Sequence, residues 1–131
     1  MTRKVAVVAG ASGVVGRGVA ELLAGDPDWE VVALARKPVD IPGVRFLPVD
    51  LIDESQCRER LSALTDATHV FYAARFDHRA GTPEPIETNA AMLRHLVDAI
   101  EPAAKGLRHI HLVHGTKWYG STLGPFPTPA L

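Results

Sequence analysis

The chain has 131 residues, of which 47% are hydrophobic and 22% charged, and its formal net charge is −1. This composition indicates one soluble globular domain, and the lack of a basic surplus gives no reason to expect nucleic acid as a partner. No run approaches the roughly 20 apolar residues of a membrane span, so we expect no membrane partner. Met1 lies only three residues ahead of the first apolar run, which leaves no room for a signal peptide. Cys57 is the only cysteine, so it cannot form an internal disulfide. We therefore expect a cytoplasmic protein, with Cys57 structural rather than catalytic.

The first predicted strand leads into a glycine-rich turn. Residues Lys4 to Ala9 form an apolar run of strand length, and three glycines follow at intervals of three. In a dinucleotide-binding turn such glycines make the tight turn, let the backbone approach the pyrophosphate and let the helix pack close to the sheet. The N-terminus of the following helix favours an anion. Glycine triplets also serve ordinary turns, but strand, turn and helix in this order predict a dinucleotide site. The residues that we expect there are Gly10, Ser12, Gly13, Val14, Val15 and Gly16.

The end of the second strand indicates which dinucleotide binds. About 20 residues past the glycines, an NAD site usually carries an acid that accepts a hydrogen bond from the ribose 2′-hydroxyl. This chain has Arg36 and Lys37 after its second strand. Two cations attract a 2′-phosphate and offer a hydroxyl no acceptor. We therefore predict NADP(H) rather than NAD(H) as the cofactor, the alternative being that both are solvated loop charges.

Strand-like and helix-like segments alternate along the whole chain. The expected strands lie near residues 4–9, 30–34, 44–48, 69–73 and 107–113, and the expected helices near 14–24, 53–64 and 86–100. Such alternation predicts an α/β fold, in which helices cover both faces of a parallel sheet and the crossovers are right-handed. Together with the nucleotide-binding turn it predicts a Rossmann-type doubly wound sheet in strand order 3-2-1-4-5, with residues 1–131 as one NAD(P)-binding domain.

Three histidines at the end of the fifth strand suggest a metal site, which strand geometry argues against. Alternation along a strand places His109 and His111 on one face and His114 on the other, unless the strand ends before His114. No cysteine or carboxylate lies close by in sequence to complete a tetrahedral site. We therefore expect no metal, and interpret these histidines as ordinary strand residues.

The segment after the fifth strand carries the most specific motif. Residues 114–126 read H-G-T-K-W-Y-G-S-T-L-G-P-F. Loops at the carboxyl ends of strands line the ligand crevice of an open α/β sheet, so we expect Lys117 in an active-site loop. The segment closely resembles the lysine-bearing motif of the progesterone 5β-reductase/iridoid synthase-like (PRISE) family of short-chain dehydrogenases/reductases. The resemblance runs from about Arg3 to Pro129, although Trp118 stands where the family often has histidine.

The resemblance implies cofactor contacts at the ends of the third and fourth strands. Asp50 and Leu51 would hold the adenine ring, whereas from its sequence position alone Asp50 could also be a solvated turn acid. Asn89 is similar to an asparagine that many reductases of the superfamily carry on the corresponding helix, though it could also be a capping or exposed residue. The residues implied at the middle of the cofactor are Ala73, Ala74 and Arg75.

The activity that the resemblance implies is reduction of the C=C bond of an enone. Hydride from NADPH would add at the β-carbon, while Lys117 and a tyrosine hydroxyl stabilise the charge that grows on the carbonyl oxygen. The usual tyrosine with a lysine four residues later is absent, because Tyr72 and Tyr119 are followed at that spacing by Phe76 and Leu123. The family's tyrosine lies in a downstream N-F-Y-Y-type motif that this sequence does not contain.

We therefore expect the N-terminal, cofactor-binding portion of a longer reductase that acts on a small-molecule enone or carbonyl substrate. Whether these residues are an enzyme by themselves stays open. Two alternatives remain: a non-catalytic NADP(H)-binding or sensing module, and a relative of the NAD-dependent epimerases and dehydratases. Ile110, Leu112 and Val113 would leave an apolar, unpaired strand at the sheet edge, so we expect a homo-oligomer.

Overall fold

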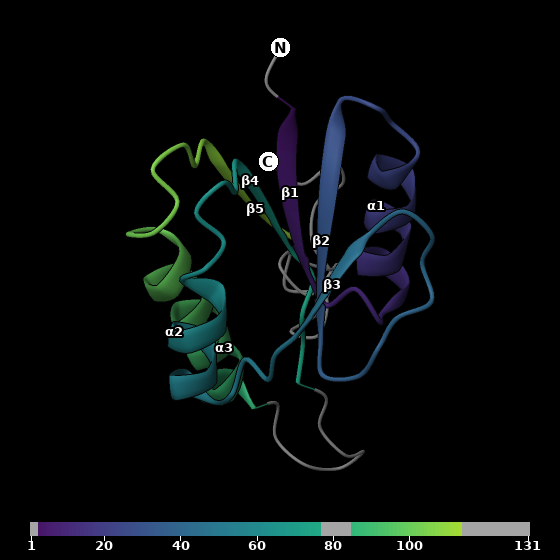
Figure 1. The fold of residues 1–131 in the computed structure, drawn as a ribbon. Coiled ribbons are helices and arrows are strands. Elements are labelled where there is room, and N and C mark those ends of the chain that lie inside the picture. The colour runs from purple at the N-terminus through teal and green to yellow at the C-terminus, as the bar shows by residue number, and fades with distance from the viewer. Residues whose placement is uncertain (1–2, 77–84, 114–131) are drawn as a thin grey trace, which may run out of the picture.

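Strands and helices alternate along the described part of the chain in the computed structural model, which covers residues 3–76 and 85–113. The strands are β1 (Lys4–Ala9), β2 (Trp29–Ala35), β3 (Arg45–Pro48), β4 (His69–Tyr72) and β5 (His109–Leu112). The helices are α1 (Val14–Ala24), α2 (Glu54–Leu61) and α3 (Ile86–Ile100). All neighbouring strands are parallel, and their order is β3-β2-β1-β4-β5 (Figure 1). The predicted α/β fold and strand order are confirmed.

Most predicted boundaries hold within one or two residues, and the largest difference is at α2. This helix ends at Leu61 rather than near Leu64. Its start is fixed by Asp53, whose carboxylate accepts a hydrogen bond from the backbone N–H of Gln56 at 3.0 Å, as an N-cap does. Beyond Leu61 the chain turns, and the N–H of Leu64 donates to the Leu61 carbonyl at 3.0 Å. A short turn thus replaces the last predicted helical turn.

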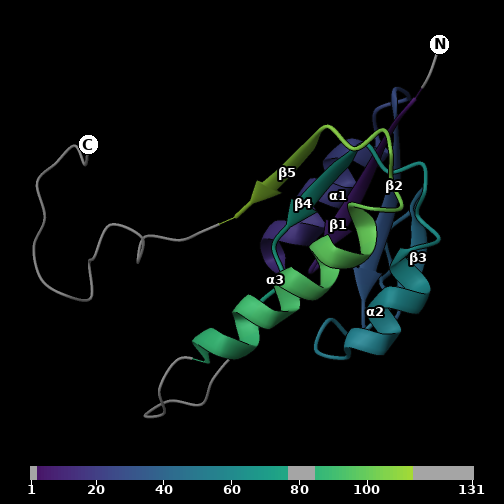
Figure 2. The same ribbon diagram turned by 90° about the vertical axis from the view of Figure 1, so that its left-hand side faces the viewer.

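The central strands β1 and β2 are buried from both sides, because their apolar side chains pack against helices on either face of the sheet. Figures 1 and 2 show α1 on one face and α2 with α3 on the other. Side chains alternate along β1, so Val7 packs towards α2 and α3 with Leu34 and Leu96, while Val8 packs towards α1 with Ala20. No helix in the described ranges is long and apolar enough to cross a membrane.

The chain reverses its direction of winding at β1, which lies between β2 and β4. After β1 it passes through α1 to β2, and after β3 it returns through α2 to β4 on the other side. The carboxyl ends of these strands meet at one edge of the sheet. Such a switch point forms the crevice in which open α/β sheets bind ligands.

Candidate functional site

The glycine turn after β1 is shaped by two close approaches of backbone. Gly10 has φ +81°, and a Cβ there would lie 2.6 Å from the backbone of Ala73 at the end of β4. A Cβ on Gly16 would lie 2.1 Å from the Gly10 carbonyl oxygen. Gly13 differs, because among the described residues its Cβ would meet only that same oxygen, at 3.5 Å, which is ordinary contact. The protein itself therefore requires glycine at 10 and 16, while the open space at Gly13 suits a ligand that approaches the backbone.

The N-terminus of α1 has the features that favour an anion. Gly13 is its N-cap and supplies no side-chain cap, and the first turn holds no acidic residue. The first helical bond runs from the Arg17 N–H to the Gly13 carbonyl at 2.9 Å. The N–H groups that precede it in a helix have no intrahelical acceptor and favour a phosphate. Val14 is 92% exposed and Val15 51% exposed, so this end of the helix is open to a ligand in the part of the protein that the structure describes.

A cavity of about 300 Å³ lies at the carboxyl ends of the strands. Most of the predicted cofactor residues line it, namely Gly10, Ser12, Gly13, Arg36, Asp50, Leu51, Ala73, Ala74 and Arg75. Val14, Val15, Gly16, Lys37 and Asn89 are not among its lining residues. Lys37 instead lines an adjoining hollow with Ser12, Arg36 and Pro38. The structure thus gathers segments from four strand ends around one space.

Five further residues line the cavity that the sequence analysis did not select: Leu34, Val49, Ile52, Phe76 and Met92. Four of them stand within two residues of a predicted site residue, so the strand ends themselves indicated their place. Met92 comes from the apolar side of α3 and is 7% exposed. An apolar helix residue of this kind looks like ordinary core in sequence, so nothing marked it as a wall of the site.

Arg36 and Lys37 are exposed at the end of β2. Within residues 3–76 and 85–113, neither makes a side-chain hydrogen bond or ion pair. Other arginines are already engaged: Arg17 pairs with Glu21 at 2.7 Å, and Arg45 lies 3.7 Å from Glu30. The two cations beside the glycine turn are therefore available to a bound anion.

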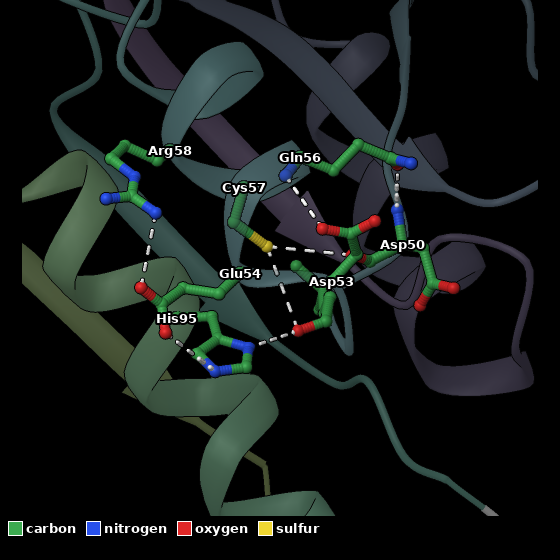
Figure 3. A network of polar contacts seen from close by, with 8 residues as sticks. Asp50, Asp53, Glu54, Gln56, Cys57, Arg58 and His95 are labelled. Atoms are coloured by element: carbon green, nitrogen blue, oxygen red, sulfur yellow. Dashed lines mark hydrogen bonds and ion pairs between the residues drawn. The ribbon is translucent and has the colours of Figure 1, made fainter.

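The turn after β3 holds Asp50 and Leu51 in a network of polar contacts (Figure 3). The backbone N–H of Asp50 donates to the Gln56 side chain at 2.7 Å, and an oxygen of its carboxylate accepts from the Ile52 N–H at 3.1 Å. The thiol of Cys57 lies 3.7 Å from the carbonyl oxygens of both Asp50 and Leu51. These contacts fix the turn against α2.

Cys57 is fully buried within this network. Burial raises the pKa of its thiol to about 11, and the negative charges of Asp53, Asp50 and Glu54 contribute to this rise. A thiol with so high a pKa is protonated at neutral pH and is a poor nucleophile. The structure therefore agrees with a structural role for Cys57.

Asn89 is placed beside the site without lining it. Its amide oxygen accepts from the Phe76 N–H at 2.7 Å, and its amide nitrogen donates to the carbonyls of Phe76 and Pro85 at 3.2 and 3.1 Å. These hydrogen bonds of Asn89 thus hold Phe76, the residue after Arg75, at the start of α3. Any contact of Asn89 with the cofactor stays a prediction.

Tyr72 does not face the crevice. Its side chain is 8% exposed and lies in the core beneath α2 and α3. Its hydroxyl has no hydrogen-bond partner in the described part of the protein, and burial raises its pKa to about 12. A hydroxyl in this position cannot donate a proton to a substrate in the cavity. Lys117 and Tyr119 lie outside the described residues.

The histidines of β5 lie on one face of the sheet, as predicted. The rings of His109 and His111 are 6.0 Å apart, and the ring of His69 on β4 is 6.4 Å from that of His109. Across residues 3–76 and 85–113, no three metal-ligating side chains come together. His114 lies outside these ranges.

Comparison with known proteins places the chain in a family. Residues 6–129 match the model of the NAD dependent epimerase/dehydratase family. The chain belongs to this family. It is 41% identical over 132 residues to a 3-oxo-Delta(4,5)-steroid 5-beta-reductase of Arabidopsis thaliana, a match that covers 93% of this chain and 32% of that protein. It is also 37% identical over 134 residues to the (S)-8-oxocitronellyl enol synthase CYC2 of Camptotheca acuminata, covering 95% and 33%.

These relatives confirm the resemblance to the progesterone 5β-reductase/iridoid synthase-like proteins. The chain spans about a third of the length of the relatives that it matches. Among solved structures, a short chain dehydrogenase/reductase family protein superimposes with a TM-score of 0.73, covering 90% of this chain and 57% of that one. At 19% identity this likeness shows the fold alone, and it confirms the Rossmann-type architecture of this epimerase/dehydratase family member.

Proposed function

We propose that residues 1–131 form a unit that binds NADP(H) and serves an enone reductase. The observation that carries the choice of cofactor is the position of Arg36 and Lys37. Both line the hollow that adjoins the glycine turn, and neither is paired with a carboxylate in the ranges that the structure describes. No acid occupies their place to accept a hydrogen bond from a ribose 2′-hydroxyl. A 2′-phosphate is the ligand group that fits them.

The remaining parts of the cofactor fit the other strand ends. The N–H groups of Val14 and Val15 at the N-terminus of α1 would hold the pyrophosphate, close to the open space at Gly13. Asp50 and Leu51 would hold the adenine ring. The cavity of about 300 Å³ is at the small end of ligand pockets, which run from about 300 to 1,000 Å³. It suits the adenosine end of the cofactor, and Ala73, Ala74 and Arg75, which also line it, would approach the middle.

The reaction that we propose is reduction of an activated C=C bond in a small-molecule enone. The bound cofactor supplies hydride to the β-carbon of the substrate. Lys117 would attract the negative charge that develops on the carbonyl oxygen. The proposal is supported by relatives named as a steroid 5-beta-reductase and an enol synthase, and by the lysine-bearing segment of residues 114–126.

The buried hydroxyl of Tyr72 favours a second candidate. A charge-stabilising site usually has at least two donors at the oxyanion, and Tyr72 cannot be one of them. The second candidate is therefore a non-catalytic NADP(H)-binding or sensing module. Turnover of any enone by these 131 residues would exclude that function.

Affinity chromatography tests the choice of cofactor. The protein is loaded on immobilised adenosine 2′,5′-bisphosphate and eluted with NADP⁺ or with NAD⁺ at the same concentration. We expect retention, elution by NADP⁺ and little elution by NAD⁺, with the Arg36→Ala variant retained weakly. An Arg17→Ala variant is the matched control, because Arg17 is engaged by Glu21 and by the Asp40 carbonyl. Equal elution by both nucleotides would contradict the proposal.

We also propose that the protein resides in a reducing compartment such as the cytoplasm, which suits its single cysteine.

We further propose that the chain self-associates through β5. In the described sheet β5 pairs with β4 on one side and forms the edge on the other. Leu112 is 43% exposed and Val113 is 38% exposed. An apolar edge strand is a template for a second chain. Light scattering should report a dimer or a larger species, and a monomer at high concentration would contradict this.

A further inference from the structure

We propose that His95 is a positioning residue for the adenine end of the cofactor, and that it orients the Asp50 carboxylate through the Leu51–Ile52 peptide. His95 lies on α3 and does not line the cavity. This inference rests on the proposed function, since it assigns a role at the same site. The proposed role of His95 concerns the selectivity of the site for adenine over other bases.

The first contact joins α3 to the turn after β3. Nδ1 of His95 lies 2.8 Å from the carbonyl oxygen of Leu51, which is 44 residues away in sequence (Figure 3). A carbonyl oxygen only accepts hydrogen bonds, so Nδ1 must carry the proton and donate it. The side chain of His95 is 14% exposed, so water competes little for this bond.

The second contact lies on the opposite side of the same peptide. A trans peptide is planar, and its C=O and N–H point in opposite directions. Because the Leu51 carbonyl is held by His95, the N–H of Ile52 points the other way, where it donates to an oxygen of the Asp50 carboxylate at 3.1 Å. His95 therefore acts on the Asp50 side chain through one rigid peptide unit.

The peptide between Asp50 and Leu51 is held in one orientation for the same reason. The Asp50 carbonyl accepts from the Asp53 N–H at 3.0 Å and lies 3.7 Å from the Cys57 thiol. The N–H of Leu51 must then point away from α2. Asp50 and Leu51 both line the cavity, so the turn presents a carboxylate acceptor and an N–H donor side by side.

This pair complements adenine in particular. The 6-amino group of adenine is a donor that fits a carboxylate oxygen, and its N1 is an acceptor that fits a backbone N–H. Hypoxanthine carries a carbonyl at position 6 and a proton on N1, so it reverses both features. A carboxylate held in place rejects hypoxanthine strongly, whereas a rotating carboxylate can turn away from it.

The other side of the His95 ring is held loosely. Nε2 lies 3.9 Å from a carboxylate oxygen of Glu54, beyond hydrogen-bond distance, and Glu54 is shared with Arg58 at 3.3 Å. Glu54 and Arg58 are both well exposed, so this pairing is weak. The bond from Nδ1 to Leu51 is thus the contact by which His95 acts on the site.

The test measures dissociation constants for NADPH and for its hypoxanthine analogue, reduced nicotinamide hypoxanthine dinucleotide phosphate. The wild-type chain should prefer NADPH. In His95→Leu the preference should fall by about 3- to 10-fold, the effect of losing one net hydrogen bond. His95→Asn should keep the preference within about twofold, because the Asn amide nitrogen occupies the place of Nδ1 and can donate in its stead. His95→Gln carries its amide at the place of Nε2 and should behave like the Leu variant.

Asp98→Asn, a change at an exposed position one turn further along α3, is the control that should leave the preference unchanged. If His95 only stabilised the fold, its loss would weaken both nucleotides equally and leave the ratio intact, and the inference would be wrong. An unchanged ratio in His95→Leu with tight NADPH binding overturns the inference alone. If the wild-type chain bound neither nucleotide, the proposed function would fail first and the inference would fall with it.

Discussion

A Cβ atom on Gly16 would lie 2.1 Å from the carbonyl oxygen of Gly10. The first turn of α1 therefore packs against the end of β1 only because residue 16 has no side chain. Gly18 lies two residues along the same helix, and a Cβ there would have no neighbour within 4 Å among the described residues. The two glycines thus offer a matched pair in one helix, one at a close approach and the other in open space.

We predict opposite effects of alanine at these positions. Gly16→Ala forces backbone apart and should destabilise the chain by about 1–3 kcal/mol or more, as overpacking does. It should also weaken cofactor binding, since the N-terminus of α1 would move. Gly18→Ala should stabilise the chain by about 0.5–1 kcal/mol, because alanine favours a helix over glycine. Urea unfolding of both variants measures this, and equal losses would contradict the role given to Gly16.

Much of the architecture was predictable because the apolar runs are short and bounded by clear turns. The glycine turn, Arg36 and Asp50 all follow a strand closely, so knowledge of the strand ends was enough to gather them at one edge. Contacts that span the chain were not predictable in this way. The bond from His95 to Leu51 joins residues 44 apart and depends on how α3 packs beside α2. The burial of Tyr72 likewise depends on which face of β4 those helices cover.

Cys57 should be unreactive in the folded protein. It is fully buried, and the pKa of its thiol is raised to about 11, so about one thiol in a thousand is ionised at pH 8. A thiol reagent such as Ellman's reagent should label the native chain slowly and the denatured chain at once. Fast, stoichiometric labelling of the native chain would show that the turn after β3 is open and that the network around Asp50 is not formed.

The stability of the chain should fall between pH 7 and pH 5 in part because of His69. Burial lowers the pKa of His69 from 6.5, and the positive charges near it, those of His109, Lys4 and Arg108, lower it further. A lowered pKa in the folded state means that the unfolded chain binds the proton more tightly. The contribution of His69 to the stability of the folded chain is therefore fully present above pH 6.5, and it is lost as the pH falls through the folded-state pKa.

The measurement compares urea unfolding of the wild type and of His69→Asn across this range. The wild type should lose more stability than the variant as the pH falls from 7 to 5. At pH 8 both side chains are neutral, which provides the reference for any change in packing. Parallel losses in the two proteins would show that His69 does not contribute to the pH dependence.

The chain of 131 residues should oxidise NADPH with a simple cyclic enone slowly or not at all. Tyr72 is buried and cannot assist Lys117 at the carbonyl oxygen, and loss of one such donor typically slows a reaction by about 10²–10³-fold. The comparison is a chimera that continues into the remaining part of the Arabidopsis thaliana relative. In the chimera turnover should appear and Lys117→Ala should remove most of it. Equal rates for chain and chimera, unaffected by Lys117→Ala, would show the role given to Lys117 to be wrong.

Calorimetric titration of the chain with NADPH and with NADH measures directly which cofactor it prefers. We predict tighter binding of NADPH, because Arg36 and Lys37 meet the 2′-phosphate at the glycine turn. Arg36→Ala should remove most of the difference while NADH affinity changes little, since a hydrogen bond to a charged group is worth about 1.5–3 kcal/mol. Equal affinities of the wild-type chain for the two cofactors would show that Arg36 and Lys37 do not select NADP(H).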